Sequence, residues 1–524
     1  MSLSADVLSQ LQNIVGEENV TVASEDIRYY SQDIYREAKQ HVIAGIKPGS
    51  TQELSQIVKL ASANGYSVYP RGAGMSYTGG YLPTTSNAIT IDMTRMNNIV
   101  EINKEDMYVT VEAGCTWQKL YLALKEQGLR TPFWGTLSGL LATIGGTISQ
   151  NGAFFGSGVY GAAADSVISI CAVTGEGNVI NTGSNAIANS KPFFRHYGPD
   201  LTGLFCGDAG ALGLKTMVTL KLITPPKVKR FVSFNFDDYE SMFKATAAVG
   251  QSGLAAECFG FDPVLQQQRM KRESLVKDVK AFSDVLKSSD SVSSAIKDAA
   301  QLSVAGRGFM DKVNFSIHVT VEQDSDVAAD QAINEIRGMC KRTGGNEIAN
   351  SIPKIISANP FVPLTNMVGP MGERWAPVHG LAAHSNAEMT MRKIEQFFSE
   401  QNETLDQFNI KVGYLFANIE CSVVIIEPVF FWPDELMTVH ERNLDAKFFK
   451  RLNKFSADPD ARAAVEKIHD GLVETFRMCK VSHFQLGKCY PYTDVIGAEN
   501  LVLIKAIKHS LDPQGIINPG ALGL

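Results

Sequence analysis

Apolar positions in the first hundred residues change between two periods, which predicts helices packed on strands. From residue 51 to 64 they repeat with the period of a helix that has one buried face, at Leu54, Ile57, Val58 and Ala61. Short, mostly apolar runs at 41–47, 66–69 and 88–93 predict strands before and after this helix. The pattern therefore predicts a sheet that is covered by helices.

The alternation of periods continues to about residue 180. Alternating apolar positions predict strands at 99–102 and 107–111, and a helix follows at 117–126. A longer apolar strand at 165–173 ends in a Thr-Gly-Glu-Gly turn, which predicts a hairpin. The pattern of residues 4–40 predicts a short amphipathic helix followed by a polar segment with several tyrosines. We expect this segment to lie across the surface of the first domain.

Pro225-Pro226 marks a boundary, after which the organisation changes. Strands are predicted at 231–236 and 315–321, and helices at 239–249, 327–342 and 386–400. This alternation predicts an antiparallel sheet with helices on one face and a ligand on the other. The charged, serine-rich stretch 272–300 is predicted to be a helix-prone surface excursion.

Length and composition limit the class of protein. A chain of 524 residues is too long for one core and predicts two domains or an interrupted one. The net charge of −7 favours neither nucleic acid nor an anionic membrane as a partner. The eight cysteines contain no CxxC pair, so neither a disulfide framework nor structural zinc is expected. With no apolar run long enough for a membrane span and no secretion signal, we expect a cytoplasmic protein.

Two glycine-rich segments carry the candidate chemistry. The first, 69–80, reads Tyr-Pro-Arg-Gly-Ala-Gly-Met-Ser-Tyr-Thr-Gly-Gly and can turn backbone N–H groups toward one anion, as in a diphosphate cradle. The second, 135–161, contains eight glycines, which allow the backbone to lie against a flat ring system. The alternative for both is an ordinary set of tight turns, because short glycine motifs match often by chance.

These motifs resemble the FAD-binding domain of the vanillyl-alcohol oxidase / p-cresol methylhydroxylase family. The similar segments are Pro-Arg-Gly-x-Gly-x-Ser-x-x-Gly-Gly, Thr-Ile-Gly-Gly-x-x-x-x-Asn at 143–151, the stretch 205–222, and a Asp-Pro-x-Gly-Ile-x-Asn-Pro-Gly tail. The resemblance implies an α+β fold: a PCMH-type FAD-binding domain of two subdomains (1–226), an antiparallel-sheet substrate or cap domain (227–458), and a C-terminal segment (459–524) that returns to the FAD domain.

The resemblance also implies the FAD contacts. They are Pro70, Arg71, Gly72, Ala73, Gly74, Met75, Ser76, Gly79, Thr136, Ser138, Thr143, Ile144, Gly145, Gly146, Asn151, Gly156, Gly213 and Asn518. Asp208 and Ala209 depart from the family's usual Ser-Glu, which is expected to alter a contact near the cofactor. The histidine that attaches FAD in the alcohol oxidases is missing near 421, so non-covalent FAD is expected, with Cys421 as the local candidate for a covalent bond.

Candidate catalytic residues come from the cap and the tail. Lys488, Tyr490 and Tyr492 stand where phenol-oxidising relatives place a Tyr-Arg pair that stabilises a phenolate, and the lysine can also bind a carboxylate. His379 follows a Trp-x-Pro-Val segment and is a candidate base. The structural alternatives are tyrosines packed on the sheet, a solvated lysine and a buried histidine bonded to a carbonyl. A histidine-rich metal motif is missing from 411–425, so no metal is expected.

The resemblance thus predicts an FAD-dependent oxidoreductase. The first choice of substrate is a small phenolic or aromatic alcohol that gives a hydride to the flavin. The rival substrate is a 2-hydroxy acid such as D-lactate or glycolate, and a second alternative is a redox-inactive flavoprotein subunit. Oxygen, a cytochrome or a quinone is expected to take the electrons, and a homodimer is expected from the family.

Overall fold

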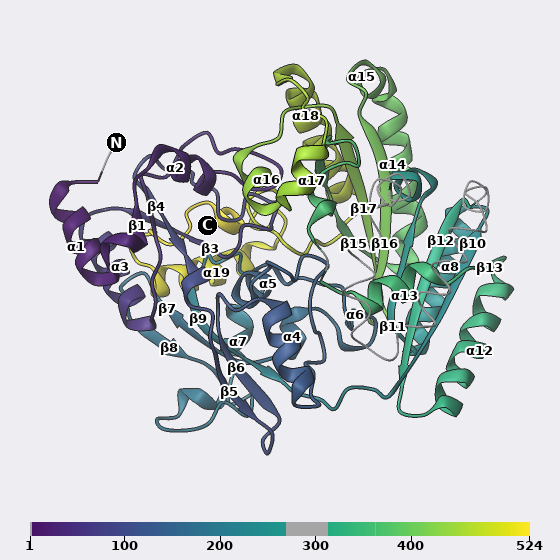
Figure 1. Ribbon diagram of the computed structural model, residues 1–524, viewed down its shortest axis with the longest axis horizontal. Helices are drawn as coiled ribbons and strands as arrows, with labels where there is room; N and C mark the ends of the chain where they lie inside the picture. Colours follow the sequence, from purple (N-terminus) through teal and green to yellow (C-terminus); the bar gives the residue numbers. More distant parts are fainter. Residues whose placement is uncertain (1–2, 269–312, 362) are drawn as a thin grey trace.

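The computed structural model describes residues 3–268, 313–361 and 363–524, which form two lobes (Figure 1). The first lobe holds two small sheets, and the second holds one sheet of eight strands with helices along one face. The predicted stretch 272–300 lies outside the described residues. The mixed helix and sheet architecture with an antiparallel sheet confirms the predicted α+β class.

The first sheet has the strand order β1-β2-β4-β3 and is parallel except at its β1 edge. Its strands are β1 (Val20–Thr21), β2 (Ala44–Ile46), β3 (Ser67–Arg71) and β4 (Ala88–Asp92). Helices α1 (Ala5–Val15) and α3 (Thr51–Ala63) pack beside it and share its apolar core. Ser50 caps α3 because its hydroxyl accepts a hydrogen bond from the Glu53 N–H at 3.1 Å. The helix predicted over 51–64 and the strands around it are confirmed.

The second sheet is antiparallel and has the order β5-β6-β9-β7-β8. Its strands are β5 (Ile99–Asn103), β6 (Tyr108–Glu112), β7 (Val167–Val173), β8 (Val179–Asn181) and β9 (Leu214–Lys221). Four helices accompany it, α4 (Trp117–Glu126), α5 (Ile144–Gln150), α6 (Ser157–Tyr160) and α7 (Leu201–Leu204). The strand predicted from residue 165 begins only at Val167, because residues 163–166 form a 3-10 turn.

The eight-stranded sheet belongs to the second lobe. Its strands are β10 (Val228–Phe236), β11 (Ala255–Phe261), β12 (Phe315–Gln323), β13 (Asn346–Ile348), β14 (Arg374–Pro377), β15 (Gly380–Ala383), β16 (Lys411–Ile419) and β17 (Val423–Trp432). All its pairings are antiparallel. One face is covered by α8 (Tyr239–Ser252), α12 (Asp326–Arg342), α14 (His384–Glu400) and α18 (Pro459–Met478). The other face turns toward the first lobe.

Other helices complete the two lobes, and the tail connects them. The remaining helices are α2 (Ser24–Tyr30), α13 (Ser351–Ala358), α15 (Asn402–Gln407), α16 (Thr438–Asn443), α17 (Ala446–Arg451) and α19 (Ala498–Leu511). Helix α18 packs against α14 in the second lobe, whereas the end of the chain lies in the first lobe (Figure 1). There the Val68 N–H donates to the Ile516 carbonyl and the Asn518 N–H donates to the Val68 carbonyl, both at 2.8 Å. The tail thus crosses from one lobe to the other.

Candidate functional site

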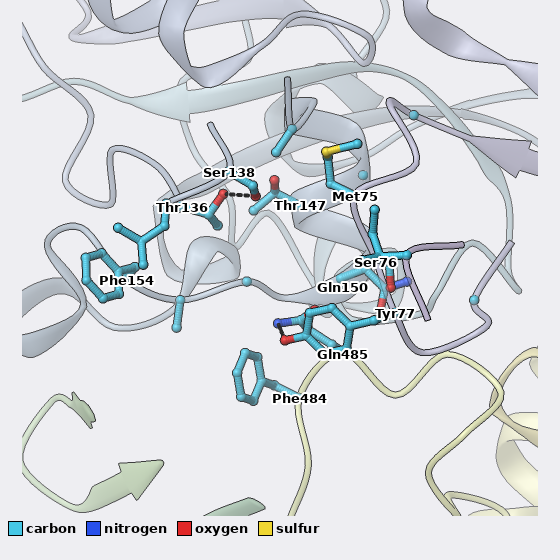
Figure 2. A pocket seen from close by; sticks show the side chains of 18 of the residues that line it. Met75, Ser76, Tyr77, Thr136, Ser138, Thr147, Gln150, Phe154, Phe484 and Gln485 are labelled. Carbon is cyan, nitrogen blue, oxygen red and sulfur yellow. Dashed lines mark hydrogen bonds between the residues drawn. The ribbon is translucent and has the colours of Figure 1, made fainter. Parts of the chain in front are cut away.

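A large cavity lies between the two lobes and is lined by residues of both. The residues before 226 that line it form the amino-terminal wall, and those between 227 and 458 form the cap wall. The amino-terminal wall consists of three glycine-containing segments, 70–77, 136–157 and 209–215, with a few neighbours. Phe484 and Gln485 of the tail complete the lining (Figure 2). Two glycine-rich segments far apart in the sequence therefore meet at one cavity.

Glycines bring the first two segments into close contact. A Cβ atom on Gly72 would collide with the Thr143 hydroxyl, and one on Gly145 would come within 2.6 Å of the Ala113 Cβ. Gly74 has φ +75°, and a Cβ there would collide with the Arg71 guanidinium. The positive φ of Gly74 favours glycine, and an added Cβ at Gly72 or Gly145 would force a neighbouring residue to move. The result is a cavity wall that consists largely of main chain.

Arg71 lies inside this wall, fully buried. Its guanidinium donates to the Gln32 carbonyl at 2.8 Å and lies 4.6 Å from the ring centroids of both Tyr29 and Tyr81. One terminal nitrogen has no hydrogen-bond partner among the described residues. A buried cation with an unused donor, on the lining of the cavity, favours an anionic group in the space in front of it.

The second segment is helical at the cavity, which sequence reasoning did not predict. Helix α5 begins after Thr143, whose hydroxyl accepts a hydrogen bond from the Gly146 N–H at 3.3 Å. Gly145 and Gly146, in its first turn, line the cavity, while Ile144 points into the core of the lobe. Gly145 lets this short helix approach the backbone at Ala113.

The third segment explains the unusual Asp208-Ala209 pair. The Asp208 carboxylate accepts a hydrogen bond from Lys215 Nζ at 2.6 Å, and both side chains are buried. It also accepts hydrogen bonds from the N–H groups of Gly210 and Leu212, at 3.0 and 3.3 Å. Ala209 takes the left-handed φ of +50° that this turn requires. The ion pair therefore holds the 209–213 turn and places a lysine on the cavity lining.

The cap wall is chiefly aromatic and aliphatic. It is formed by one face of β11, β14, β16 and β17, and its larger apolar members are Phe259, Leu265, Trp375, Leu415, Val429 and Phe431. Phe484 from the tail and Phe154 from the first lobe extend this surface (Figure 2). Tyr77 lies edge-on to Trp375, with ring centroids 5.3 Å apart. A flat, apolar molecule suits such a surface.

Charged groups divide sharply between the walls. Among the lining residues that the structure describes, the amino-terminal wall contains Arg71 and Lys215 and no carboxylate. The cap wall contains Glu257 and Glu427 and no lysine, arginine or histidine. The amino-terminal wall is therefore suited to an anion, and the cap wall is not.

The residues predicted to contact FAD fall into two groups. Those that line the cavity are Pro70, Arg71, Gly72, Ala73, Gly74, Met75, Ser76, Thr136, Ser138, Thr143, Gly145, Gly146 and Gly213. The other five lie behind it and support it: Gly79, Ile144, Asn151, Gly156 and Asn518. The Gly79 N–H, for example, donates to Asp33 at 2.8 Å. The Asn518 amide donates to the carbonyls of Gly80 and Ala209, both at 2.7 Å, and so ties two lining segments together.

Lys488 lies outside the cavity lining. Its ammonium donates to the Leu82 carbonyl at 2.6 Å and to the Asn518 side-chain oxygen at 2.8 Å. Burial lowers the pKa of this lysine to about 7. These hydrogen bonds anchor the tail to the first lobe. The contact of Lys488 with a substrate stays a prediction.

The other three candidate catalytic residues also lie behind the lining. The Tyr490 hydroxyl accepts a hydrogen bond from the His379 N–H at 2.9 Å. The His379 ring stacks on Phe484 at 4.1 Å, and burial holds the pKa of this histidine well below its usual value. Tyr492 packs in a small cluster beside Ala209. His379 and Tyr490 thus support lining residues from the second layer, and their catalytic roles stay predictions. Neither ring nitrogen of His379 has a hydrogen-bond partner among the described residues, so the expected bond to a carbonyl is not found.

Two further predictions concern attachment and metals. Cys421 is exposed in the turn between β16 and β17 and is not among the lining residues. Within the described ranges, no group of three or more histidine, cysteine, aspartate or glutamate side chains is placed to hold a metal ion. In the same ranges, no helix is both long and apolar enough to cross a bilayer.

Sequence reasoning missed several lining residues, among them Lys215, Glu257, Glu427, Phe484 and Gln485. A usable signal existed for Glu257, because a single carboxylate interrupts the apolar strand Leu-Ala-Ala-Glu-Cys-Phe-Gly-Phe. Glu427 likewise stands within the long apolar strand β17. Charged residues inside buried strands deserve a functional interpretation when the strand faces a cavity.

Comparison with protein families identifies the cofactor. Residues 43–183 match the family model described as FAD binding domain, and residues 490–522 match the one described as FAD linked oxidases, C-terminal domain. The cavity fits FAD, because its carboxylate-free wall of glycine backbone with two cations suits a diphosphate. FAD is therefore the cofactor, as predicted, and the matches support the broader family of FAD-linked oxidases without selecting the vanillyl-alcohol oxidase branch.

Several curated proteins resemble parts of this chain. D-lactate dehydrogenase [cytochrome] 1, mitochondrial, of Saccharomyces cerevisiae is 30% identical over 47% of this chain and 42% of its own length. Glycolate oxidase subunit GlcD of Bacillus subtilis is 31% identical over 44% of this chain and 47% of its own. D-2-hydroxyglutarate dehydrogenase of Xanthomonas citri is 27% identical over 48% and 51%, respectively. The chain thus spans about half the length of these relatives.

Solved structures share the fold over nearly the whole chain. A 4-ethylphenol oxidase from Gulosibacter chungangensis has a TM-score of 0.73 at 17% identity and covers 99% of this chain and 97% of its own. A substrate-bound p-cresol methylhydroxylase gives 0.73 at 17%, with 99% and 96% covered. An alkyldihydroxyacetonephosphate synthase gives 0.69 at 14%, with 99% and 85% covered. The PCMH-type fold is therefore confirmed.

Proposed function

We propose that this chain is an FAD-dependent oxidoreductase that oxidises an apolar, hydroxyl-bearing small molecule, an aromatic alcohol or an alkylphenol. The observation that carries the proposal is the cap wall, which offers aromatic surface and two carboxylates but no cation among its described residues. Such a wall accepts a flat neutral molecule and repels an acid. The relatives name several different substrates, so the proposal rests on the cap wall.

Residues of the amino-terminal wall would hold the cofactor. The backbone of 72–76 and 145–146 would take the diphosphate, with Arg71 as the nearby cation and the Asp208–Lys215 pair holding the third segment. FAD, when bound, supplies the two-electron acceptor chemistry. The protein's own contribution is to hold the substrate against it and to exclude water.

The cap and the tail supply that exclusion. Trp375, Phe431 and Phe484 present apolar surface to the cavity. Polar contacts come from Tyr77, whose hydroxyl accepts a long 3.4 Å hydrogen bond from Gln485. Burial holds the pKa of Tyr77 well above its usual value, so its hydroxyl stays protonated and can donate to a bound oxygen.

A 2-hydroxy acid is the second candidate, because the relatives named above include a D-lactate dehydrogenase and a D-2-hydroxyglutarate dehydrogenase. Its carboxylate would need a cation in the cavity. The two cations that line the described cavity belong to the amino-terminal wall, and Lys215 is already paired with Asp208. The geometry thus favours the neutral substrate.

Anaerobic reduction of the bound flavin tests the proposal. We expect 4-alkylphenols or benzylic alcohols to bleach the visible flavin band, and D-lactate, glycolate and D-2-hydroxyglutarate to leave it unchanged. Bleaching by the acids alone would replace the proposed substrate class with the second one. If dithionite bleaches the flavin and no alcohol or acid does, the chain is a redox-inactive flavoprotein.

The same preparation addresses the remaining predictions. Acid precipitation releases the flavin into the supernatant if it is bound without a covalent link, as we propose. Reoxidation by oxygen, a cytochrome or a quinone identifies the electron acceptor, and light scattering tests the proposed homodimer.

A further inference from the structure

Glu257 is the carboxylate at one end of the cap wall. It lies on β11, in a run of otherwise apolar residues, and is 6% exposed. Its neighbour along the same face of the strand is Phe259, which also lines the cavity. A carboxylate in such a position is costly unless it is hydrogen-bonded or used.

One oxygen of Glu257 is held by the first lobe. Oε1 accepts a hydrogen bond from the Gly156 N–H at 3.0 Å. Gly156 has φ +85°, and a Cβ there would come within 2.5 Å of the Pro132 carbonyl, so only glycine fits. No described residue donates a hydrogen bond to the second oxygen, and Glu257 is among the residues that line the cavity. One acceptor is thus oriented and the other is available to a ligand.

The nearby cations each contact another carboxylate. Arg130 of the first lobe and Lys229 of β10 both contact Glu322 Oε1, at 2.8 and 2.9 Å. Tyr160 of α6 faces the same cluster. Burial and the Glu322 charge raise the pKa of Glu257 to about 7, while Lys229, the Gly156 N–H and Arg130 act in the opposite direction. Glu257 therefore ionises near neutral pH with its charge only partly compensated.

We propose that Glu257 binds the hydroxyl group of a neutral ligand through its free carboxylate oxygen and excludes ligands that carry a carboxylate. This inference rests on the proposed function and adds to it the residue that selects the substrate class. A hydroxyl donating to an ionised carboxylate makes a charge-assisted hydrogen bond. A ligand carboxylate at the same place would meet a second negative charge in a poorly solvated cavity.

The selectivity is expected to depend on pH. As the pH rises through about 7, Glu257 loses its proton, so a neutral hydroxyl ligand binds more tightly and an acid binds less tightly. The groups that face Glu257 and share this titration are Glu322, Lys229, Arg130 and Tyr160.

Ligand binding to the FAD-loaded protein tests the inference without turnover. We choose 4-chlorophenol and 4-chlorobenzoate, which share one ring and have no side-chain carbon to oxidise. Titrations followed by the flavin absorption spectrum and by calorimetry give both dissociation constants. The wild-type protein is expected to prefer the phenol at least tenfold at about pH 8, since a hydrogen bond to a charged group is worth roughly that much or more.

The variant Glu257→Gln keeps the size of the side chain and removes its charge. We expect the preference for 4-chlorophenol over 4-chlorobenzoate to fall at least tenfold in this variant, because the phenol binds more weakly and the benzoate more strongly. Glu335→Gln, an exposed carboxylate on α12, is the matched control and is expected to keep the wild-type ratio. An unchanged ratio in Glu257→Gln overturns the inference.

A second measurement covers the case in which Glu257→Gln fails to fold. In the wild-type protein, the affinity for 4-chlorophenol divided by that for 4-chlorobenzoate is expected to rise from about pH 5.5 to about pH 8. Over this range the phenol stays neutral and the benzoate stays anionic. A flat ratio overturns the inference. Failure of the proposed function looks different: no alcohol bleaches the flavin although the phenol preference and its loss in Glu257→Gln are both present.

Discussion

The two walls of the cavity are made in different ways and do different work. The amino-terminal wall is largely backbone, shaped by glycines at which an added Cβ would press on neighbouring atoms, and its charged members are the cations Arg71 and Lys215. The cap wall is formed by side chains on a pleated sheet, mostly aromatic, and its charged members are Glu257 and Glu427. The first wall is suited to a diphosphate and the second to a neutral ring.

This difference explains why one wall can be recognised from the sequence and the other cannot. A backbone cradle for a cofactor needs glycines at set spacings, so it leaves a readable motif. A wall of alternate residues on four strands leaves no motif, because its members are brought together only by strand pairing. The cofactor motifs accordingly lie in the first wall, and the proposed choice of substrate rests on the second.

The largest effect is expected from breaking the ion pair of the amino-terminal wall. Asp208→Ala leaves Lys215 buried without its carboxylate, so the free energy of unfolding of the apoprotein should fall by about 3 to 5 kcal/mol. Chemical denaturation measures it. Asp208→Ala combined with Lys215→Met should recover most of the loss. Asp106→Ala breaks an exposed pair with Lys191 and should cost less than about 1 kcal/mol; equal losses at the two sites would contradict the prediction.

The next largest effect is expected from adding a side chain at Gly145. Gly145→Ala places a methyl group against the Cβ and carbonyl of Ala113, at 2.6 and 2.9 Å, and so moves the start of α5 away from the cavity. FAD affinity should fall by about 100-fold, with a stability loss of about 1 to 3 kcal/mol. Equilibrium dialysis of FAD measures the first. Gly497→Ala, whose added Cβ would meet nothing closer than 3.8 Å, should bind FAD normally.

A cation added to the lining contributed by the tail should reduce the preference of the cavity for a neutral ligand. Gln485→Arg places a guanidinium on the lining, opposite Tyr77. Binding of 4-chlorobenzoate should strengthen by roughly tenfold, and 4-chlorophenol should change little, because only the anion gains a charge partner. Gln485→Met serves as the uncharged control. Unchanged benzoate affinity would mean that the missing cation does not set the selectivity.

The smallest effect on chemistry is expected at Lys488. Lys488→Met removes hydrogen bonds to the Leu82 carbonyl and Asn518, so stability should fall by about 1 to 2 kcal/mol. Because burial lowers the pKa of this lysine to about 7, the wild-type protein should gain stability between about pH 7 and 10 as the buried charge is lost, and the variant should not. Ligand preference should be unchanged. A shift in that preference would support the predicted contact of Lys488 with the substrate.

Much of the fold was predictable because it rests on local signals. The 3.6-residue stripe of 51–64 formed α3, and the helix predicted at 117–126 formed α4 at the same residues. Most of the predicted cofactor contacts line the cavity because they lie within the glycine motifs themselves. The short helix α5 was missed, because its glycines disfavour a helix locally and only packing against Ala113 stabilises it there.

The candidate catalytic residues show the limit of such reasoning. Lys488, Tyr490 and His379 were chosen by position in the chain, and all three lie one layer behind the lining. Glu257 and Glu427, which do line it, are separated by 170 positions in the sequence and share a wall only because β11 pairs with β16 and β16 with β17. No local pattern contains that pairing.

By itself the sequence predicted a glycine-shaped cradle for an anionic cofactor group, because backbone conformation is dictated by the residues that must adopt it. Only the tertiary structure decided which side chains form the cap wall, because a cavity wall is assembled from strands whose register is set by long-range hydrogen bonds and the packing of a buried face.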